Sequence, residues 1–98
     1  MAKFDVYRTP DGWLALDCQA DTLNFLTTRL AVPLVPKGDA PQPVDRLNPM
    51  FVVDGEAVMM VTQFAAALPN TELRHLVTSL ATHEYEIGSA LDMLISGF

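Results

Sequence analysis

The chain has 98 residues, half of them hydrophobic, and a mean hydropathy of +0.23. This length and composition fit a single folded domain over residues 1–98 and argue against intrinsic disorder. Six basic residues against twelve acidic ones give a net charge of −6, which disfavours unaided binding to nucleic-acid phosphates. The excess lies in residues 50–98, where Arg74 alone faces six carboxylates, a net charge of −5.

The single cysteine, Cys18, excludes an internal disulfide and favours a reducing compartment. The start of the chain lacks the apolar run of a secretory signal, since Lys3 and Arg8 flank a mixed segment. The longest apolar runs have five residues, far below the ~18 needed to span a bilayer. We therefore expect a cytoplasmic protein without a membrane partner.

The first half of the chain is patterned as strands. Apolar and polar residues alternate over 3–7, and the turn dipeptide Asp-Gly at 11–12 separates this run from 13–18, which predicts a β-hairpin. A further strand is expected over 29–35. Pro33 has no N–H to donate there, so it favours a sheet edge or a bulge.

A long loop and a second hairpin follow. Residues 36–49 contain four prolines, which predicts an exposed loop that is either functional or a solvated connector. A second Asp-Gly dipeptide, at 54–55, divides two β-rich runs and predicts a hairpin over 50–62. Residues 63–68 are expected to continue as strand or turn.

The apolar spacing changes in the last third of the chain. Leucine and valine residues at 73, 76, 77 and 80 have helical spacing, yet whether 70–80 is helical or irregular stays open. The same spacing from Ile87 to Ile95 predicts a C-terminal helix over 82–95, with Thr82 as its N-cap and Gly97 at its end. Five to seven short strands and one helix make a mostly β (α+β) domain.

No constellation for catalysis or metal binding stands out. The few candidate ligands, His75, His83 and Cys18, have no metal-ligand spacing, so neither a metal nor a cofactor is expected. A small hydrolase using Ser79 or Ser89 with His83 is a weak alternative, because no G-x-S-x-G motif positions either serine. We therefore expect a protein without catalytic residues.

The C-terminus is unusual because it is apolar to its last residue. Free chain ends are normally polar and frayed, whereas this one contains Leu94, Ile95 and Phe98. These side chains either complete the core or form a contact surface, including a dimer interface with a second copy.

Several segments, in chain order, resemble the CcdB family of toxin–antitoxin toxins. They are Asp-Cys-Gln-Ala-Asp at 17–21, Val-Pro-Leu at 32–34, Val-Val-Asp-Gly-Glu at 52–56 with Met59, Met60 and Thr62, Ala-Leu-Pro at 67–69, and Ser-Gly-Phe at 96–98. The resemblance covers nearly the whole chain. Its most specific part is the Asp-Gly-Glu hairpin followed by the paired methionines.

The resemblance implies an SH3-like small β-barrel with an additional small sheet and a C-terminal helix. It further implies a bacterial cytoplasmic homodimer that binds the A subunit of DNA gyrase and traps the enzyme on cleaved DNA, without being an enzyme itself. A cognate CcdA-like antitoxin neutralises such toxins, and the pair represses its own operon. Operator DNA is therefore expected to be contacted only through the antitoxin.

The resemblance also assigns residues by position. Gyrase contacts fall on Ser96, Gly97 and Phe98 and, on the preceding helix, on Glu84, Tyr85, Ser89 and Asp92; antitoxin contacts fall on Thr9, Asp11, Trp13, Asp45 and Arg46. The family ends in Trp-Gly-Ile, so Ser96 stands where a tryptophan stacks on a gyrase arginine, a cation–π contact worth about 0.5–2 kcal/mol. The alternative is a CcdB-fold binding module that has lost gyrase poisoning and acts as antitoxin partner or co-repressor.

Overall fold

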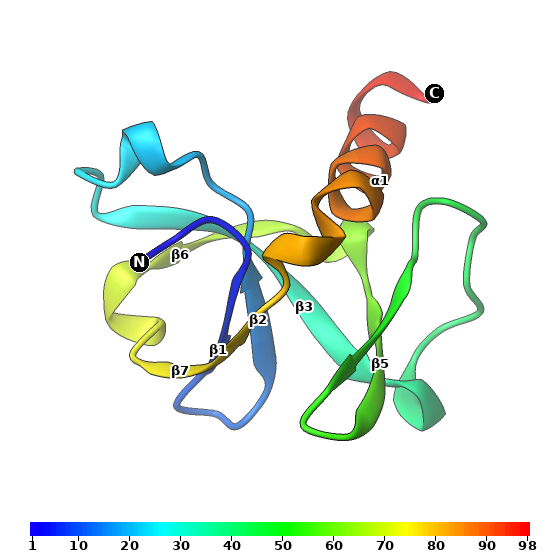
Figure 1. Ribbon diagram of the computed structural model, residues 1–98, viewed down its shortest axis with the longest axis horizontal. Helices are drawn as coiled ribbons and strands as arrows, with labels where there is room; N and C mark the ends of the chain where they lie inside the picture. The colour runs from blue at the N-terminus through cyan, green and yellow to red at the C-terminus, as the bar shows by residue number, and fades with distance from the viewer.

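The structure is a computed structural model that describes residues 1–98 as seven strands, five short 3₁₀ helices and one α-helix (Figure 1). The strands are β1 (Asp5–Arg8), β2 (Leu14–Asp17), β3 (Thr28–Pro36), β4 (Met50–Val53), β5 (Glu56–Met60), β6 (Ala66–Pro69) and β7 (His75–Ser79). The 3₁₀ helices span Asp21–Leu23, Lys37–Asp39, Thr62–Phe64, Asn70–Glu72 and Ala81–His83, and the α-helix α1 spans Glu84–Ser96.

All strand pairs are antiparallel and form one curled sheet in the order β4-β5-β3-β2-β1-β7. The nine-residue β3 is long enough to pair with two strands along one edge, β6 beside its first half and β5 beside its second. The predicted mostly β class with a C-terminal helix is confirmed. The additional small sheet that the family resemblance implies is not separate, because all seven strands, including β6 through its pairing with β3, belong to one sheet.

Pro33 lies neither on an edge strand nor at a bulge, because β3 is central in the sheet and pairs with β2 through Ala15 opposite Pro33. The Pro33 carbonyl accepts a hydrogen bond from the Val61 N–H at 3.0 Å. This carbonyl therefore points toward the side of β3 on which β5 and β6 pair. That position lies between Ala31, the last residue paired with β6, and Leu34, the first paired with β5. The missing N–H therefore falls where β3 changes partner.

Residues 75–79 form an edge strand instead of the helix or irregular segment left open by the sequence. This strand, β7, pairs with β1 across an irregularity between Val6 and Tyr7. The helical spacing of these apolar residues does not come from a helix, because the residues do not share one buried face. Leu73 packs beside Tyr7, Leu80 lies in the main core, and Leu76 is exposed.

The C-terminal helix is confirmed, but its start is not capped by Thr82. A 3₁₀ turn over Ala81–His83 leads directly into α1, and His83 occupies the N-cap position without a side-chain hydrogen bond. The other end agrees with the prediction, since Gly97 has φ +80° and donates its N–H to the Met93 carbonyl at 3.0 Å.

Two apolar clusters lie on opposite faces of the sheet. The main core packs Val6, Leu16 and Val32 against α1, which contributes Ile87 and Ala90. The smaller cluster comprises Tyr7, Ala15, Ala31 and Leu73. Because the buried residues of α1 lie in its first two turns, the last turn of the helix lies outside the core. None of the helices combines the length and apolar character needed to cross a membrane.

Candidate functional site

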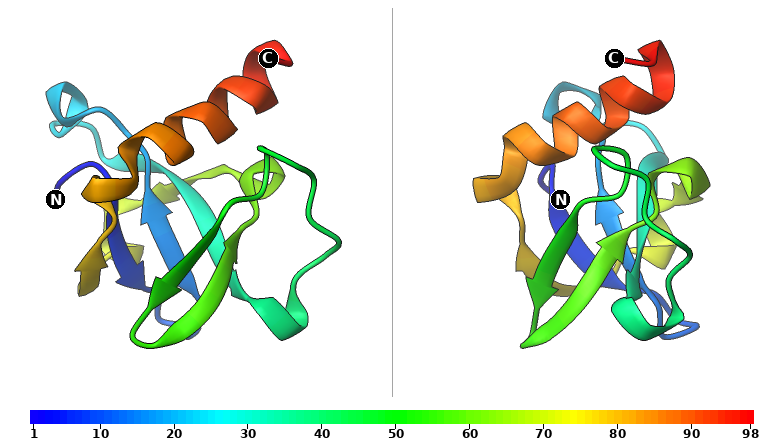
Figure 2. Two further views of the ribbon diagram at one scale, coloured as in Figure 1. Left: turned by 45° about the vertical axis from the view of Figure 1, so that its right-hand side comes forward. Right: turned by 90° about the vertical axis from the view of Figure 1, so that its right-hand side faces the viewer.

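The last turn of α1 projects beyond the sheet, as both views of Figure 2 show. Ile95 and Phe98 are 79% and 80% exposed, and Leu94 is also exposed, so these side chains do not complete the core. Gly97 ends the helix in the left-handed conformation and turns the chain so that Phe98 follows a sharp bend. An exposed apolar tip of this kind is typical of a contact surface.

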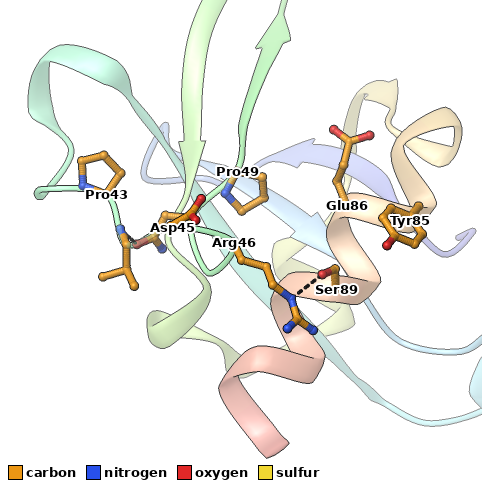
Figure 3. Close-up of a pocket in the computed structure, with 9 residues that line it drawn as sticks. Pro43, Asp45, Arg46, Pro49, Tyr85, Glu86 and Ser89 are labelled. Carbon is orange, nitrogen blue, oxygen red and sulfur yellow. Dashed lines mark hydrogen bonds between the residues drawn. The ribbon is translucent and has the colours of Figure 1, made fainter. Parts of the chain in front are cut away.

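The loop between β3 and β4 lies against α1 and is tied to it by one long side chain. The Nε–H of Arg46 donates a hydrogen bond to Oγ of Ser89 at 2.6 Å (Figure 3). Arg46 has φ +67°, a backbone conformation that is uncommon outside glycine. No carboxylate forms an ion pair with it. The two terminal nitrogens of its guanidinium therefore remain available to a partner.

Asn48 holds this loop in place. Its amide donates to the Met60 carbonyl at 3.0 Å and to Oε1 of Gln63 at 2.8 Å, while its side-chain oxygen accepts from the Val44 N–H at 2.9 Å. The hydroxyl of Thr62 donates to the Leu47 carbonyl. With both flanks fixed, the turn presents Asp45 and Arg46 beside the helix in a defined position.

Two adjoining hollows lie where the loop meets the helix, and Arg46, Tyr85 and Ser89 line both. The larger, of about 730 Å³, lies between the prolines of the loop and the first turns of α1, and its lining includes Pro43, Pro49, Tyr85 and Glu86. The smaller, of about 290 Å³, lies along α1 itself and is lined by Arg46, Glu84, Tyr85, Gly88, Ser89 and Asp92. The surface therefore combines carboxylates, one guanidinium and the 85% exposed ring of Tyr85.

The structure brings together some of the residues predicted as contacts and separates others. Asp45 and Arg46, predicted for the antitoxin, lie beside Tyr85 and Ser89, predicted for gyrase. Asp11 and Trp13 are exposed in the β1–β2 turn, at the far end of the molecule from the C-terminus in Figure 1. Thr9, in the same turn, is buried, and its Oγ1 has no hydrogen-bond partner.

The residues considered for hydrolysis do not form a serine–histidine pair. The hydroxyl of Ser79 accepts from the Ala81 N–H at 3.1 Å and that of Ser89 accepts from Arg46, while Nδ1 of His83 lies 3.5 Å from a carboxylate oxygen of Glu86. His83 also packs against the ring of Phe51. The hydrolase hypothesis therefore gains no support from the geometry.

Cys18 is a core residue. Burial, together with the neighbouring Asp17 carboxylate, raises the pKa of the Cys18 thiol to about 12. An activated nucleophile needs the opposite shift, toward neutral pH. No group of three or more His, Cys, Asp or Glu side chains lies close enough to hold a metal ion.

Two residues of this surface were not recognised in the sequence. Asn48 gave no local signal, because its partner Met60 ends β5 and its partner Gln63 lies in the 3₁₀ helix Thr62–Phe64. Gly88 did give one, since glycine weakens a helix interior, but only the structure shows that it lines a hollow.

A protein-family model described as "CcdB protein" matches residues 3–97 of the chain. Among solved structures, "Endoribonuclease from Mycobacterial species" superposes with a TM-score of 0.79 at 16% identity, covering 97% of this chain and 90% of that one. At this identity the likeness shows a common fold and nothing more. No curated protein matches the chain.

Proposed function

Since this chain belongs to the CcdB family of toxin–antitoxin toxins, we propose that it inhibits DNA gyrase by binding the A subunit of that enzyme and trapping it on cleaved DNA. In this proposal the protein acts by binding, in stoichiometric amounts, and has no catalytic residues of its own. The contact surface consists of the C-terminal tip and the adjacent face of α1, defined by Ser96, Gly97, Phe98, Glu84, Tyr85, Ser89 and Asp92.

One observation carries the proposal: the end of α1 has no partner within the chain. Its apolar side chains Ile95 and Phe98 are exposed at the projecting tip. Exposing them to water is unfavourable unless another protein covers them. In addition, the net charge of −5 in residues 50–98 suits a basic protein surface of the kind that handles DNA.

We propose that a cognate antitoxin neutralises the toxin through Asp45 and Arg46, together with Asp11 and Trp13 of the β1–β2 turn. The hydrogen bond between Arg46 and Ser89 supports overlap between the antitoxin surface and the gyrase surface. An antitoxin that binds the Arg46 side chain breaks its hydrogen bond to Ser89, which lies on the helix proposed to contact gyrase. The pair of proteins represses its operon, and operator DNA is contacted by the antitoxin because the toxin is acidic.

The proposal includes a homodimer in which Leu94, Ile95 and Phe98 contribute to the interface. Their exposure in the single chain is compatible with this role. Phe98 then lies close to both the second copy and gyrase, so the tip of α1 from each protomer takes part in one composite surface.

A second candidate is RNA cleavage, suggested by the name of the structural neighbour, an endoribonuclease. The charge of this chain disfavours it. Of the six basic residues, Arg29 is buried against Asp17, which leaves few cations to neutralise RNA phosphates. The other alternative, a binding module that no longer poisons gyrase, depends on Ser96 at the tryptophan position.

The test is a supercoiling and DNA-cleavage assay with gyrase from the same host, comparing the full chain with a variant lacking Gly97 and Phe98. The full chain should inhibit supercoiling and accumulate cleaved DNA at stoichiometric amounts. The truncated variant should do neither, while its binding to the antitoxin and its melting temperature persist. Leu76→Ala, which removes an exposed apolar group on β7, is the matched control and should inhibit like the full chain.

Two outcomes contradict the proposal. If the full chain neither inhibits supercoiling nor traps cleaved DNA but still binds the antitoxin, the protein is a binding module without poisoning activity. If it instead cleaves RNA in the absence of gyrase, the endoribonuclease function is correct.

A further inference from the structure

We propose that the free edge of β4 binds an extended segment of the cognate antitoxin as an added strand. The inference rests on the proposed function and names the way in which the antitoxin binds. In this kind of binding, backbone hydrogen bonds supply affinity and pockets for alternate side chains supply specificity. It assigns roles to Met50 and Val52, which are not among the residues that the family resemblance supplies.

The two edges of the sheet differ in how they are guarded against pairing. The sheet ends at β4 on one side and at β7 on the other. β7 has two features that hinder the addition of a strand, since its register is irregular and the exposed Arg74 and His75 lie at its start. β4 has the sequence Met-Phe-Val-Val, without charge or proline, and pairs with β5 in an unbroken register. Such an apolar edge is a template for another strand.

The backbone groups of Met50 and Val52 point to this free edge. A two-residue turn joins β4 to β5, so Phe51 and Val53 form the hydrogen-bonded pairs with β5 and the groups of Met50 and Val52 face away from it. None of the backbone hydrogen bonds of the turns and loops involves either residue. Val52 is 69% exposed and Met50 is 41% exposed, so the rest of the chain does not cover them. Alternate residues of β4 therefore offer the donors and acceptors that an added strand needs.

A hollow beside β4 suits a side chain of the added strand. It has a volume of about 300 Å³, and its lining includes Met50, Met59, Pro41 and Pro43. Met50 and Met59 are directly opposite each other in the hairpin, on the face turned away from the main core. Methionine side chains adapt their shape to an apolar partner. An apolar residue of the antitoxin that lies beside Met50 can therefore be buried in this hollow.

The neighbouring surface favours the antitoxin as the occupant. β4 follows the loop that presents Asp45 and Arg46, and in both views of Figure 2 the hairpin runs from this loop, beside α1, to a turn on the opposite side of the molecule. At that turn Asp54 and Glu56 are exposed and form no ion pair. A segment that binds Arg46 and continues along β4 thus meets two carboxylates, which favour a basic residue. A second copy of β4 contains no basic residue to pair with them.

The first experiment measures amide hydrogen exchange of the full chain, alone and in complex with the full-length antitoxin encoded in the same operon. In the free chain the amides of Met50 and Val52 should exchange rapidly, whereas those of Phe51 and Val53, which bond to β5, should exchange slowly. The antitoxin should slow exchange at Met50 and Val52 by about tenfold or more. Phe51 and Val53 are the internal control, because they are bonded in both states.

The second experiment measures antitoxin affinity in variants of the edge. Val52→Pro removes the outward N–H and leaves the bonds to β5 intact, a change that an edge strand tolerates. It should weaken binding by about tenfold or more, and Val52→Thr, which keeps the N–H, should weaken it less. Leu76→Ala on β7 is the matched control at the other edge and should bind like the wild type.

A charge variant tests the far end of the segment. The double variant Asp54→Asn with Glu56→Gln should weaken antitoxin binding and flatten its salt dependence. Asparagine accepts the positive φ of residue 54, so the turn should persist.

The inference is overturned if the antitoxin binds while the amides of Met50 and Val52 exchange as in the free chain. In that case neutralisation by the antitoxin stands and the edge of β4 is unused. Slowed exchange that appears without antitoxin and grows with the concentration of the chain identifies a second copy as the occupant, and it also overturns the inference. If the unsubstituted chain binds no antitoxin, the proposed neutralisation fails and the inference fails with it.

Discussion

Arg46 and Ser89, 43 residues apart in the sequence, are joined by a hydrogen bond of 2.6 Å from Nε to Oγ. One residue comes from a loop without regular structure and the other from the middle of α1. The bond is exposed, so its contribution to stability is small, but it determines the direction of the only cation on this surface.

Ser89→Ala should release the Arg46 side chain while changing the free energy of unfolding by less than about 1 kcal/mol, because the bond is solvent-exposed. Amide and side-chain NMR of labelled arginine measures the effect: the Nε–H of Arg46 should exchange faster with water. Ser89→Thr keeps a hydroxyl and should preserve the slow exchange. Equal exchange rates in the wild type and in Ser89→Ala would show that the bond is not held in solution.

If the chain binds gyrase as proposed, Ser96→Trp should strengthen that binding, because it places an aromatic face on the last turn of α1, where the family has its tryptophan. A cation–π contact of about 0.5–2 kcal/mol corresponds to a lower dissociation constant by about twofold to thirtyfold. Ser96→Leu adds apolar area without a comparable ring and is the matched control. If both variants gain equally, the gain comes from burial of apolar area and no stacking contact forms.

The strands with local signals were predicted from the sequence. Asp54 and Gly55 have φ of +50° and +78°, the conformation that their dipeptide permits, and they join β4 to β5 as expected. The start of α1 and the conformation of 75–79 could not be predicted in the same way. Leu73 and Leu80 belong to two clusters on opposite faces of the sheet, and a single sequence does not reveal that division.

The candidate site was predictable only in part. The apolar residues Leu94, Ile95 and Phe98 were predicted either to complete the core or to form a contact surface, and the structure leaves all three exposed. By contrast, the contact of Arg46 with Ser89 depends on where Asn48 fixes the loop, through bonds to Met60 and Gln63. Such contacts follow from the curling of the sheet, which no local pattern encodes.

Arg29 and Asp17 form a buried ion pair. Removing one of the two charges should destabilise the fold strongly, whereas replacing both residues with apolar ones should cost less. Both side chains are almost fully buried, 2.7 Å apart, and Arg29 also donates to Asn24 and to the Gln19 carbonyl. Asp17→Asn removes the carboxylate charge beside a buried guanidinium, so the free energy of unfolding should fall by about 3–5 kcal/mol. Urea unfolding followed by the fluorescence of Trp13 measures this change.

The matched control is the double variant Asp17→Leu with Arg29→Met, which replaces both charges by apolar groups. Its stability should exceed that of Asp17→Asn, because no charge remains buried without its partner. A double variant as unstable as Asp17→Asn would mean that the hydrogen bonds of Arg29 to residues 19 and 24, and not the charge pairing, dominate.

Cys18 should make the protein sensitive to alkali. Burial raises the pKa of its thiol from 9.0 to about 12, so between these values the unfolded chain has lost the proton and the folded chain still holds it. The contribution to stability is therefore complete below pH 9 and decreases as the pH rises toward 12. Burial likewise raises the pKa of Tyr7 from 10.0 to about 12, which adds to the loss of stability above pH 10.

Cys18→Ala should show a shallower decline in unfolding free energy between pH 9 and pH 12. The part of the decline that comes from Tyr7 should remain. In the folded wild type, the thiol should not react with a disulfide reagent at about pH 8 until urea unfolds the chain; reaction at the rate of free cysteine would contradict both the burial and the pKa shift.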